Sequence, residues 1–263
     1  MTDFIRLQIN GPIAELIFNK PERRNALCLS MWRAIPTLLT QAVDDPCVSV
    51  IIIHGGDAGC FAAGADISEF AEIYATAKHA AESSDILGAG VQAIERCSKP
   101  VVAAVEGACF GGGVSIAAAC DLRFVAENSK FGVTPGKLGL LYSPADTRRL
   151  IRMVGLAHAK DLLFSGRIIS FDEAKTMGIV DHHVPAGGAL SAAHEWATTV
   201  ATTAQSSVRA TKAMITGLEA GWSDDEASAR ELFLKALSGE DFKEGYNAFL
   251  EKRPAQFPGN TPS

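Results

Sequence analysis

Short apolar runs separated by turn residues organise the first half of the chain. The runs 4–9 and 13–18 alternate apolar and polar residues, and Asn10-Gly11 between them is a strong signal for a hairpin turn. The run 48–54 is short, rich in β-branched residues and bounded by glycine, which is typical of a buried strand. The pattern therefore predicts a β-hairpin followed by a buried strand.

Helical patterns then alternate with further strands. A helix is expected to begin near Ser30, a candidate N-cap, and Pro36 inside this pattern should kink the helix or shift its start. Further helices are expected over 66–78, 84–97 and 114–120, and further strands over 100–105, 122–125 and 130–132. Such a succession of strand, turn and helix indicates an α/β fold with crossover connections.

From about Pro144 the pattern becomes helical nearly to the end of the chain. Two of these helical segments have one apolar face each, over 206–218 and 224–237. We therefore predict a core over residues 1–200 and a helical region over residues 201–263. The stretch 254–263 is expected to be a frayed tail.

At 263 residues the chain is long enough for one large domain or for a domain with an appendage. Its residues are 48% hydrophobic and 21% charged, which is ordinary for a globular enzyme. The net charge of −6 arises without any basic stripe, so we expect no nucleic-acid partner. Because no run approaches ~18 apolar residues and residues 1–4 lack a basic start, we expect neither a membrane span nor a signal peptide.

The six cysteines are scattered without Cys-x-x-Cys spacing, at Cys28, Cys47, Cys60, Cys97, Cys109 and Cys120. This pattern is typical of reduced thiols in a cytoplasmic protein rather than of a disulfide framework. The sequence shows no third metal-binding residue at a characteristic spacing from the neighbouring His182 and His183, so no metal site is expected.

A run of three glycines lies between a predicted strand and a small-residue helix, within Gly107-Ala108-Cys109-Phe110-Gly111-Gly112-Gly113-Val114-Ser115. Without Cβ atoms, a backbone amide in this run can approach a ligand closely. The following helix points its unsatisfied N–H groups and the positive end of its dipole at the same place. The stretch is therefore either a site for a developing negative oxygen or a turn that only packs strand against helix.

A second small-residue turn follows the buried strand, in Phe61-Ala62-Ala63-Gly64-Ala65-Asp66-Ile67. It also leads from a strand towards a helix. Two such turns can aim two backbone amides at one point, which is the arrangement of an oxyanion hole. The two segments together therefore favour the binding interpretation.

With these two turns the chain resembles the crotonase, or enoyl-CoA hydratase/isomerase, superfamily. The stretch Asn19-Lys20-Pro21-Glu22-Arg23-Arg24-Asn25-Ala26-Leu27 is similar to the family's segment near coenzyme A, and Ala248-Phe249-Leu250-Glu251-Lys252-Arg253-Pro254 is similar to its C-terminal helix. The resemblance covers nearly the whole chain. It implies a crotonase-like spiral of β-β-α units, then C-terminal helices that pack between the subunits of a homotrimer, often paired into a hexamer.

The resemblance also implies where an acyl-CoA thioester binds. The amides of Ala65 and Gly112 would hold the thioester carbonyl and stabilise an enolate or a tetrahedral oxyanion. Contacts to coenzyme A would come from Arg24, Ala26, Ala63, Asp66, Ile67, Phe249 and Lys252, the last two from the same or a neighbouring subunit. Coenzyme A would enter as part of the substrate, with no tightly bound cofactor.

The chain departs from the family pattern where the hydratases of the family carry two catalytic glutamates. The first position falls on Ser115 and the second on Pro135, and residues 131–143 contain neither Asp nor Glu. Neither residue can act as a carboxylate acid or base. The sequence therefore argues against classical two-glutamate hydration.

Two residues of the loop that replaces the second glutamate can take part in proton transfer. Tyr142 is a candidate proton donor and Asp146 a candidate base. Alternatively, Asp146 caps the following helix or pairs with Arg148 or Arg149. We expect an acyl-CoA-processing lyase or isomerase of this family. The alternatives are a thioester hydrolase or a CoA-ester-binding protein without turnover.

Overall fold

The structure, a computed structural model, describes residues 3–260. The predictions for residues 1–2 and for the last three residues of the tail therefore fall outside the described residues. The main sheet has six strands in the order β1-β2-β3-β4-β6-β9, antiparallel between β1 and β2 and parallel elsewhere. Its strands are β1 (Ile5–Asn10), β2 (Ile13–Phe18), β3 (Val50–His54), β4 (Val101–Val105), β6 (Leu122–Ala126) and β9 (His182–Val184).

Two apolar clusters cover the two faces of this sheet. Leu16 on β2 belongs to the cluster that includes α1 (Leu29–Asp44), whereas Ile13 belongs to the cluster that includes α7 (Ala189–Ala201). Because side chains alternate along a strand, successive residues enter opposite clusters. All six residues of β2 are therefore buried, although their sequence pattern alternates.

A second sheet of three short strands carries the glycine-rich stretch. Its strands are β5 (Ala108–Phe110), β7 (Lys130–Gly132) and β8 (Ile168–Ile169), with β7 in the middle. The sequence pattern did not reveal β5 or β8, because strands of two or three residues show no periodicity. The helix α4 (Gly112–Ala119) begins directly after β5, two residues before the predicted start at residue 114.

The first helices begin at other residues than the sequence suggested. Cys28 rather than Ser30 is the N-cap of α1, and Pro36 lies inside this helix without ending it. The Leu29 amide donates to the Glu69 carboxylate over 2.7 Å, so a distant acidic residue caps α1. This distant contact explains why the local pattern misplaced the start.

The predicted helices at 66–78 and 84–97 are divided differently in the structure. A 3-10 turn over Ile67–Glu69 and the short α2 (Phe70–Ile73) come first, and α3 (Ala77–Glu95) then begins well before residue 84. The side chain of Thr76 accepts a hydrogen bond from the His79 amide and so fixes the start of α3.

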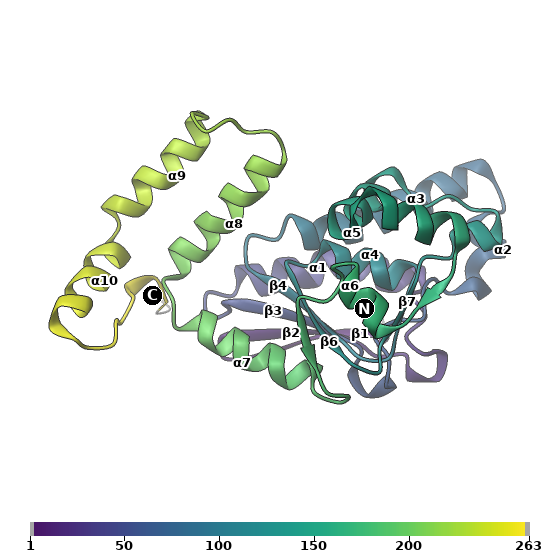
Figure 1. The fold of residues 1–263 in the computed structure, drawn as a ribbon, viewed down its shortest axis with the longest axis horizontal. Coiled ribbons are helices and arrows are strands. Elements are labelled where there is room, and N and C mark those ends of the chain that lie inside the picture. Colours follow the sequence, from purple (N-terminus) through teal and green to yellow (C-terminus); the bar gives the residue numbers. More distant parts are fainter. Residues whose placement is uncertain (1–2, 261–263) are drawn as a thin grey trace.

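The remaining helices are α5 (Pro144–Ser165), α6 (Phe171–Thr176), α8 (Gln205–Glu219), α9 (Ala227–Ser238) and α10 (Glu240–Glu251). The helices α8, α9 and α10 extend away from the sheets and form what we call the C-terminal arm (Figure 1). The region predicted as a frayed tail returns to this arm. Asn260 accepts a hydrogen bond from the Gln205 amide over 3.1 Å and donates to the carbonyl oxygens of Ala201 and Thr203. The tail prediction is therefore wrong as far as residue 260.

Candidate functional site

The two predicted turns lie side by side in the structure. A parallel bridge pairs Ala62 with Cys109. The Ala62 amide donates to the Ala108 carbonyl over 3.0 Å, and the Phe110 amide donates to the Ala62 carbonyl over 2.9 Å. Segments almost fifty residues apart in sequence are thus joined by backbone hydrogen bonds, which holds the two turns in one register.

Glycine is required at the contact between these turns. Gly64 has a φ of +100° and Gly111 a φ of +48°, conformations that residues with a Cβ rarely adopt. A Cβ on Gly64 would lie 3.3 Å from the Phe110 carbonyl oxygen, and a Cβ on Gly113 would lie 3.1 Å from the Ala62 carbonyl oxygen. The glycines therefore allow the two backbones to pack closely.

Ala65 and Gly112 each follow the Ala62–Cys109 bridge by three residues, one on each segment. Both residues are half-buried, and Gly112 is the first residue of α4. Within residues 3–260, neither of their amides donates a hydrogen bond, whereas the neighbouring amide of Asp66 donates to Leu27. The predicted pair thus consists of two free N–H groups on adjacent turns, one of them at a helix N-terminus. Such a pair can stabilise a developing negative oxygen.

Ser115 and Tyr142 form a polar pair beside this helix start. The Ser115 hydroxyl lies 2.7 Å from the Tyr142 hydroxyl, which in turn donates to the Gly111 carbonyl over 3.2 Å. Burial, followed by the negative charge of Asp146, raises the pKa of Tyr142 well above its usual value. Tyr142 is therefore a neutral phenol at physiological pH, able to donate a proton.

The second candidate, Asp146, is held at the start of α5. Its amide donates to the N-cap Ser143, whose hydroxyl donates back to the Asp146 carboxylate over 2.7 Å. The same carboxylate pairs with Arg149 at 3.0 Å. The structure thus shows the predicted pairing of Asp146 with Arg149, whereas the N-cap of α5 is Ser143 rather than Asp146.

Arg149 extends this network away from the two turns. It also pairs with Glu95 at 2.6 Å, and Glu95 pairs with Arg152 at 3.0 Å. Burial opposes ionisation of Glu95, but the two arginines prevail and lower its pKa. Glu95 is therefore ionised and neutralised by arginine, which makes it a weak base.

Three residues predicted to contact coenzyme A are gathered next to the second turn. The Ala63 amide donates to the Arg24 carbonyl over 3.0 Å, and a parallel bridge pairs Leu27 with Ala65. Arg24 is exposed, whereas Ala26 and Ala63 are half-buried. The segment 24–27 thus forms a border of the candidate oxyanion site.

Asp66 and Ile67, also predicted to contact coenzyme A, differ in what their side chains can reach. The Asp66 carboxylate pairs with Lys20 at 2.6 Å and accepts from the Ser68 hydroxyl at 2.6 Å, so its oxygens are already engaged. Ile67 is 61% exposed and is accessible to a ligand.

Phe249 and Lys252, the last predicted coenzyme A contacts, lie at the end of α10. Phe249 is 82% exposed and Lys252 is also exposed. In this chain, the C-terminal arm holds α10 away from α4 and the glycine turns (Figure 1). Within one subunit the structure therefore does not bring these two residues to the candidate site.

Two residues that were not predicted from the sequence, Trp32 and Glu69, support the site through packing and capping. The Trp32 side chain packs against Gly112, and the Glu69 carboxylate caps α1. Neither contact has a local signal, because each joins elements that are distant in sequence. Glu106 accepts from the Gly187 and Ala189 amides and so caps α7.

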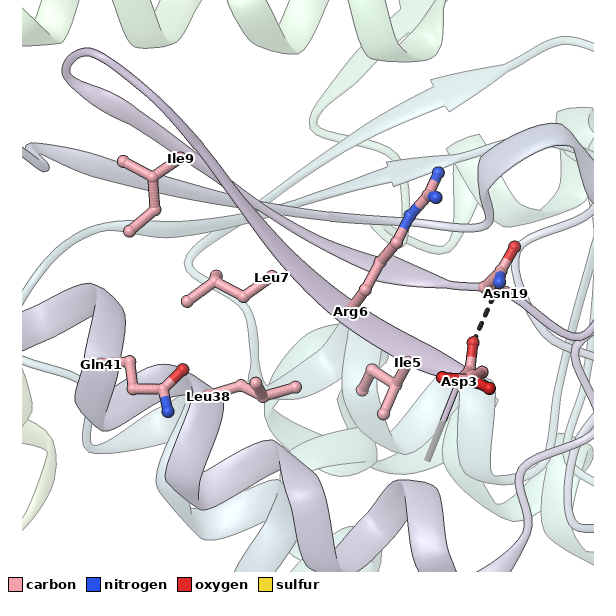
Figure 2. Close-up of a pocket in the computed structure, with 8 residues that line it drawn as sticks. All are labelled: Asp3, Ile5, Arg6, Leu7, Ile9, Asn19, Leu38 and Gln41. Atoms are coloured by element: carbon pink, nitrogen blue, oxygen red, sulfur yellow. Dashed lines mark hydrogen bonds between the residues drawn. The ribbon is translucent and has the colours of Figure 1, made fainter. Parts of the chain in front are cut away.

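A groove elsewhere on the molecule contains none of the predicted residues. It runs along the outer strand β1 next to α1, and its lining residues are Asp3, Ile5, Arg6, Leu7, Ile9, Asn19, Leu38 and Gln41 (Figure 2). Within residues 3–260, no group of three or more His, Cys, Asp and Glu residues is arranged to hold a metal ion. Over the same range, no helix has the length and apolar character needed to span a membrane.

The chain is similar to known proteins along nearly its whole length. Residues 8–260 match the family model described as enoyl-CoA hydratase/isomerase. A crystal structure of an enoyl-CoA hydratase/isomerase family protein from Hyphomonas neptunium is 57% identical, with a TM-score of 0.95 over 97% of each chain. A crotonyl-CoA hydratase from Syntrophomonas wolfei is 35% identical over 96% of this chain and 97% of its own. A short-chain-enoyl-CoA hydratase from Clostridium acetobutylicum is 33% identical over 94% of each chain.

Proposed function

This chain belongs to the enoyl-CoA hydratase/isomerase family and has its crotonase fold, and we propose that it acts on acyl-CoA thioesters through the amides of Ala65 and Gly112. The observation that carries this proposal is the pair of free N–H groups on the two bridged turns. Donors fixed in place before the reaction stabilise a thioester enolate without reorganisation. The thioester oxygen binds between them.

The reaction that we propose differs from two-glutamate hydration. Ser115 and Pro135 occupy the positions at which the family resemblance implies the two glutamates. The acidic side chains around the turns are engaged: Asp66 by Lys20, Asp146 by Arg149, and Glu69 by the Leu29 amide. The proposed site therefore uses a neutral proton donor, Tyr142, and does not rely on Asp66, Asp146 or Glu69 as a base.

Cleavage of a carbon–carbon bond forms an enolate without removal of an α-proton. Such a reaction fits a site that has a proton donor, Tyr142, but uses no carboxylate base. In a β-keto acyl-CoA, water adds to the β-carbonyl and the carbon–carbon bond breaks, leaving its electron pair on the thioester enolate. The O–H bond of Tyr142 then breaks as the α C–H bond forms, and Ser115 donates a hydrogen bond to the resulting phenolate. Solvent returns the proton to Tyr142 and takes the proton released by the added water. The products are a carboxylic acid and a shorter acyl-CoA.

A second candidate function is binding of CoA esters without turnover. It is favoured by the resting contacts of Tyr142, whose hydroxyl is already bonded to Ser115 and to the Gly111 carbonyl. For catalysis, this proton must turn from the carbonyl to the substrate. The longer 3.2 Å bond to Gly111 is the weaker of the two, which is compatible with such a turn.

The test is a mass-spectrometric turnover screen in deuterated buffer with crotonyl-CoA, β-keto and aromatic acyl-CoA esters. The proposal expects cleavage of the β-keto ester to a carboxylic acid and a shorter acyl-CoA that carries solvent deuterium at its α-carbon. A gain of one water on crotonyl-CoA would instead show a hydratase with another acid/base pair. If every ester binds by calorimetry and none is converted, the binding function replaces the proposed reaction.

For the substrate's coenzyme A portion, we propose the border formed by Arg24, Ala26, Ala63 and Ile67, with Asp66 fixing this border through Lys20. Coenzyme A enters and leaves with the thioester, and no tightly bound cofactor is part of the proposal. Phe249 and Lys252 act on the site of a neighbouring subunit, because the C-terminal arm holds them away from their own (Figure 1).

This contribution requires an oligomer, which we propose to be a homotrimer or a hexamer assembled through residues 201–263. The C-terminal arm exposes large apolar side chains at Ile215, Leu218, Phe233, Leu234, Leu237, Phe242, Tyr246, Phe249 and Leu250. Exposure of so many large apolar side chains to water is unfavourable in a monomer, and apolar surfaces of this kind are typical of protein–protein interfaces. The free thiols of all six cysteines support a cytoplasmic location.

A further inference from the structure

Trp32 carries a buried hydrogen-bond donor without an acceptor. Its residue on α1 is 2% exposed, and within residues 3–260 no atom accepts a hydrogen bond from its Nε1. Buried indole N–H groups normally find a partner, and an unpaired one destabilises the fold. An acceptor that enters with a ligand would remove this penalty.

The orientation of the indole turns the ring edge that carries this donor towards Gly112. The Cε3 atom lies 3.1 Å from the position of a Cβ on Gly90, and the Cζ2 atom lies 2.8 Å from that of a Cβ on Gly112. Nε1 and Cζ2 are both bonded to Cε2, so Nε1 belongs to the edge that faces Gly112 rather than the edge that faces Gly90. The unpaired N–H thus lies on the same edge of the indole as Cζ2, the ring atom nearest to a Cβ on Gly112.

We propose that Trp32 Nε1 donates a hydrogen bond to an oxygen on the acyl chain, and that the enzyme selects thioesters with a hydroxyl or keto oxygen near the thioester carbonyl. This inference rests on the proposed binding of the thioester at Ala65 and Gly112. When the thioester oxygen is held by Gly112, the next carbons of the acyl chain are only a few bonds from the same glycine. An oxygen on the β-carbon is then the first acceptor that the chain offers.

The expected selectivity follows from the cost of an unpaired polar group. A purely hydrocarbon acyl chain leaves Nε1 unpaired, whereas an oxygenated chain of the same length satisfies it. Sites built around a hydrogen bond reject ligands that lack the partner atom more strongly than apolar pockets reject an added methylene. We expect 3-hydroxybutyryl-CoA to bind about tenfold more tightly than butyryl-CoA.

The test uses the complete protein labelled with ¹⁵N at its three tryptophans, and follows their indole N–H resonances. Trp196→Phe and Trp222→Phe assign the Trp32 resonance by elimination, so the core indole need not be altered for the measurement. Titration with 3-hydroxybutyryl-CoA should shift this resonance downfield, whereas butyryl-CoA should not. Calorimetry on the same samples measures binding, and mass spectrometry confirms that each thioester is intact.

Trp32→Phe adds a second readout, because it removes the N–H and keeps an aromatic ring. In a folded variant, the tenfold preference for 3-hydroxybutyryl-CoA should disappear through loss of affinity for that ligand alone. If both thioesters bind and the Trp32 resonance moves equally with both or with neither, the inference is wrong although the site binds acyl-CoA. If calorimetry detects no binding of either thioester, the proposed function itself fails.

Discussion

The hydroxyl groups of Ser115 and Tyr142 lie 2.7 Å apart, which links the first turn of α4 to the loop that precedes α5. Ser115 occupies the position of an expected carboxylate, and Tyr142 belongs to the loop that contains neither Asp nor Glu. The hydrogen bond thus joins the two places where the chain departs from its family. In the proposed site, two hydrogen-bonded hydroxyl groups take the place of the two carboxylates that the family resemblance implies.

Replacing Tyr142 by Phe tests the role of this pair. We expect the rate of product formation to fall about 10²- to 10⁴-fold, because general acid catalysis contributes this much, while the Kd for the thioester changes little. Steady-state kinetics and calorimetry measure the two quantities. Tyr74→Phe, at an exposed tyrosine, is the matched control and should leave both unchanged. A normal rate in Tyr142→Phe would remove Tyr142 from the mechanism.

A methyl group on Gly112 should disrupt the site and lower stability. The Cβ of Gly112→Ala would lie 2.8 Å from the Trp32 side chain, so the buried indole or the backbone must move. We expect a loss of about 1–3 kcal/mol in the free energy of unfolding, together with a large loss of turnover. Urea denaturation and the turnover assay measure these effects.

Gly88→Ala is the matched control for this substitution. Gly88 lies within α3, and a Cβ there meets no atom within 4 Å. Alanine should therefore stabilise the helix by roughly 0.5–1 kcal/mol and leave turnover intact. If Gly112→Ala were as harmless as Gly88→Ala, the close contact with Trp32 would not constrain the site.

The Lys20–Asp66 pair should make stability depend on pH in the acidic range. Hydrogen bonds from Lys20, and then from Ser68, lower the pKa of Asp66 to about 2. An aspartate with a lowered pKa stabilises the fold above its unfolded pKa of about 3.9, and this contribution is lost as the pH falls towards 2. We expect Asp66→Asn to cost about 2 kcal/mol or more at pH 7, with the difference shrinking below about pH 4.

Unfolding free energies of the wild type and of Asp66→Asn, measured from pH 7 down to the acid transition, check this prediction. Asp57→Asn, at an exposed turn residue, should follow the wild-type curve throughout. A constant difference between Asp66→Asn and the wild type at every pH would mean that the ionised pair is not its source.

A charge on the apolar face of the C-terminal arm should prevent assembly. Phe233 on α9 is 60% exposed, and Phe233→Glu should convert a trimer or hexamer of 27.8 kDa chains into monomers, because a buried charge without a partner is costly. Light scattering coupled to size exclusion measures the mass. Glu231→Gln, an exposed substitution on the same helix, should leave the mass unchanged. A monomeric wild type would contradict the proposed assembly directly.

Local chemistry determined a large part of this protein from its sequence. The hairpin at Asn10-Gly11, the main-sheet strands β1, β2, β3, β4 and β6 and the α/β class follow from turn residues and β-branched runs, and the structure has them in these places. The short strand β9 of the same sheet was not among the predicted strands. The two glycine-containing turns could also be predicted from the sequence. Gly64 and Gly111 have a positive φ in the structure, a conformation that favours glycine. These features depend on neighbours in the chain, so the sequence alone specifies them.

The tertiary structure decided which side chains face one another. The cap of Leu29 comes from Glu69, and Tyr142 meets Ser115. No periodicity records such contacts, because they arise from packing between helices and turns that are distant in sequence. The same holds for Trp32, whose indole lies against Gly112 from another helix. The sequence thus determined the backbone framework of the candidate site, whereas packing between distant elements decided the acid/base chemistry available within it.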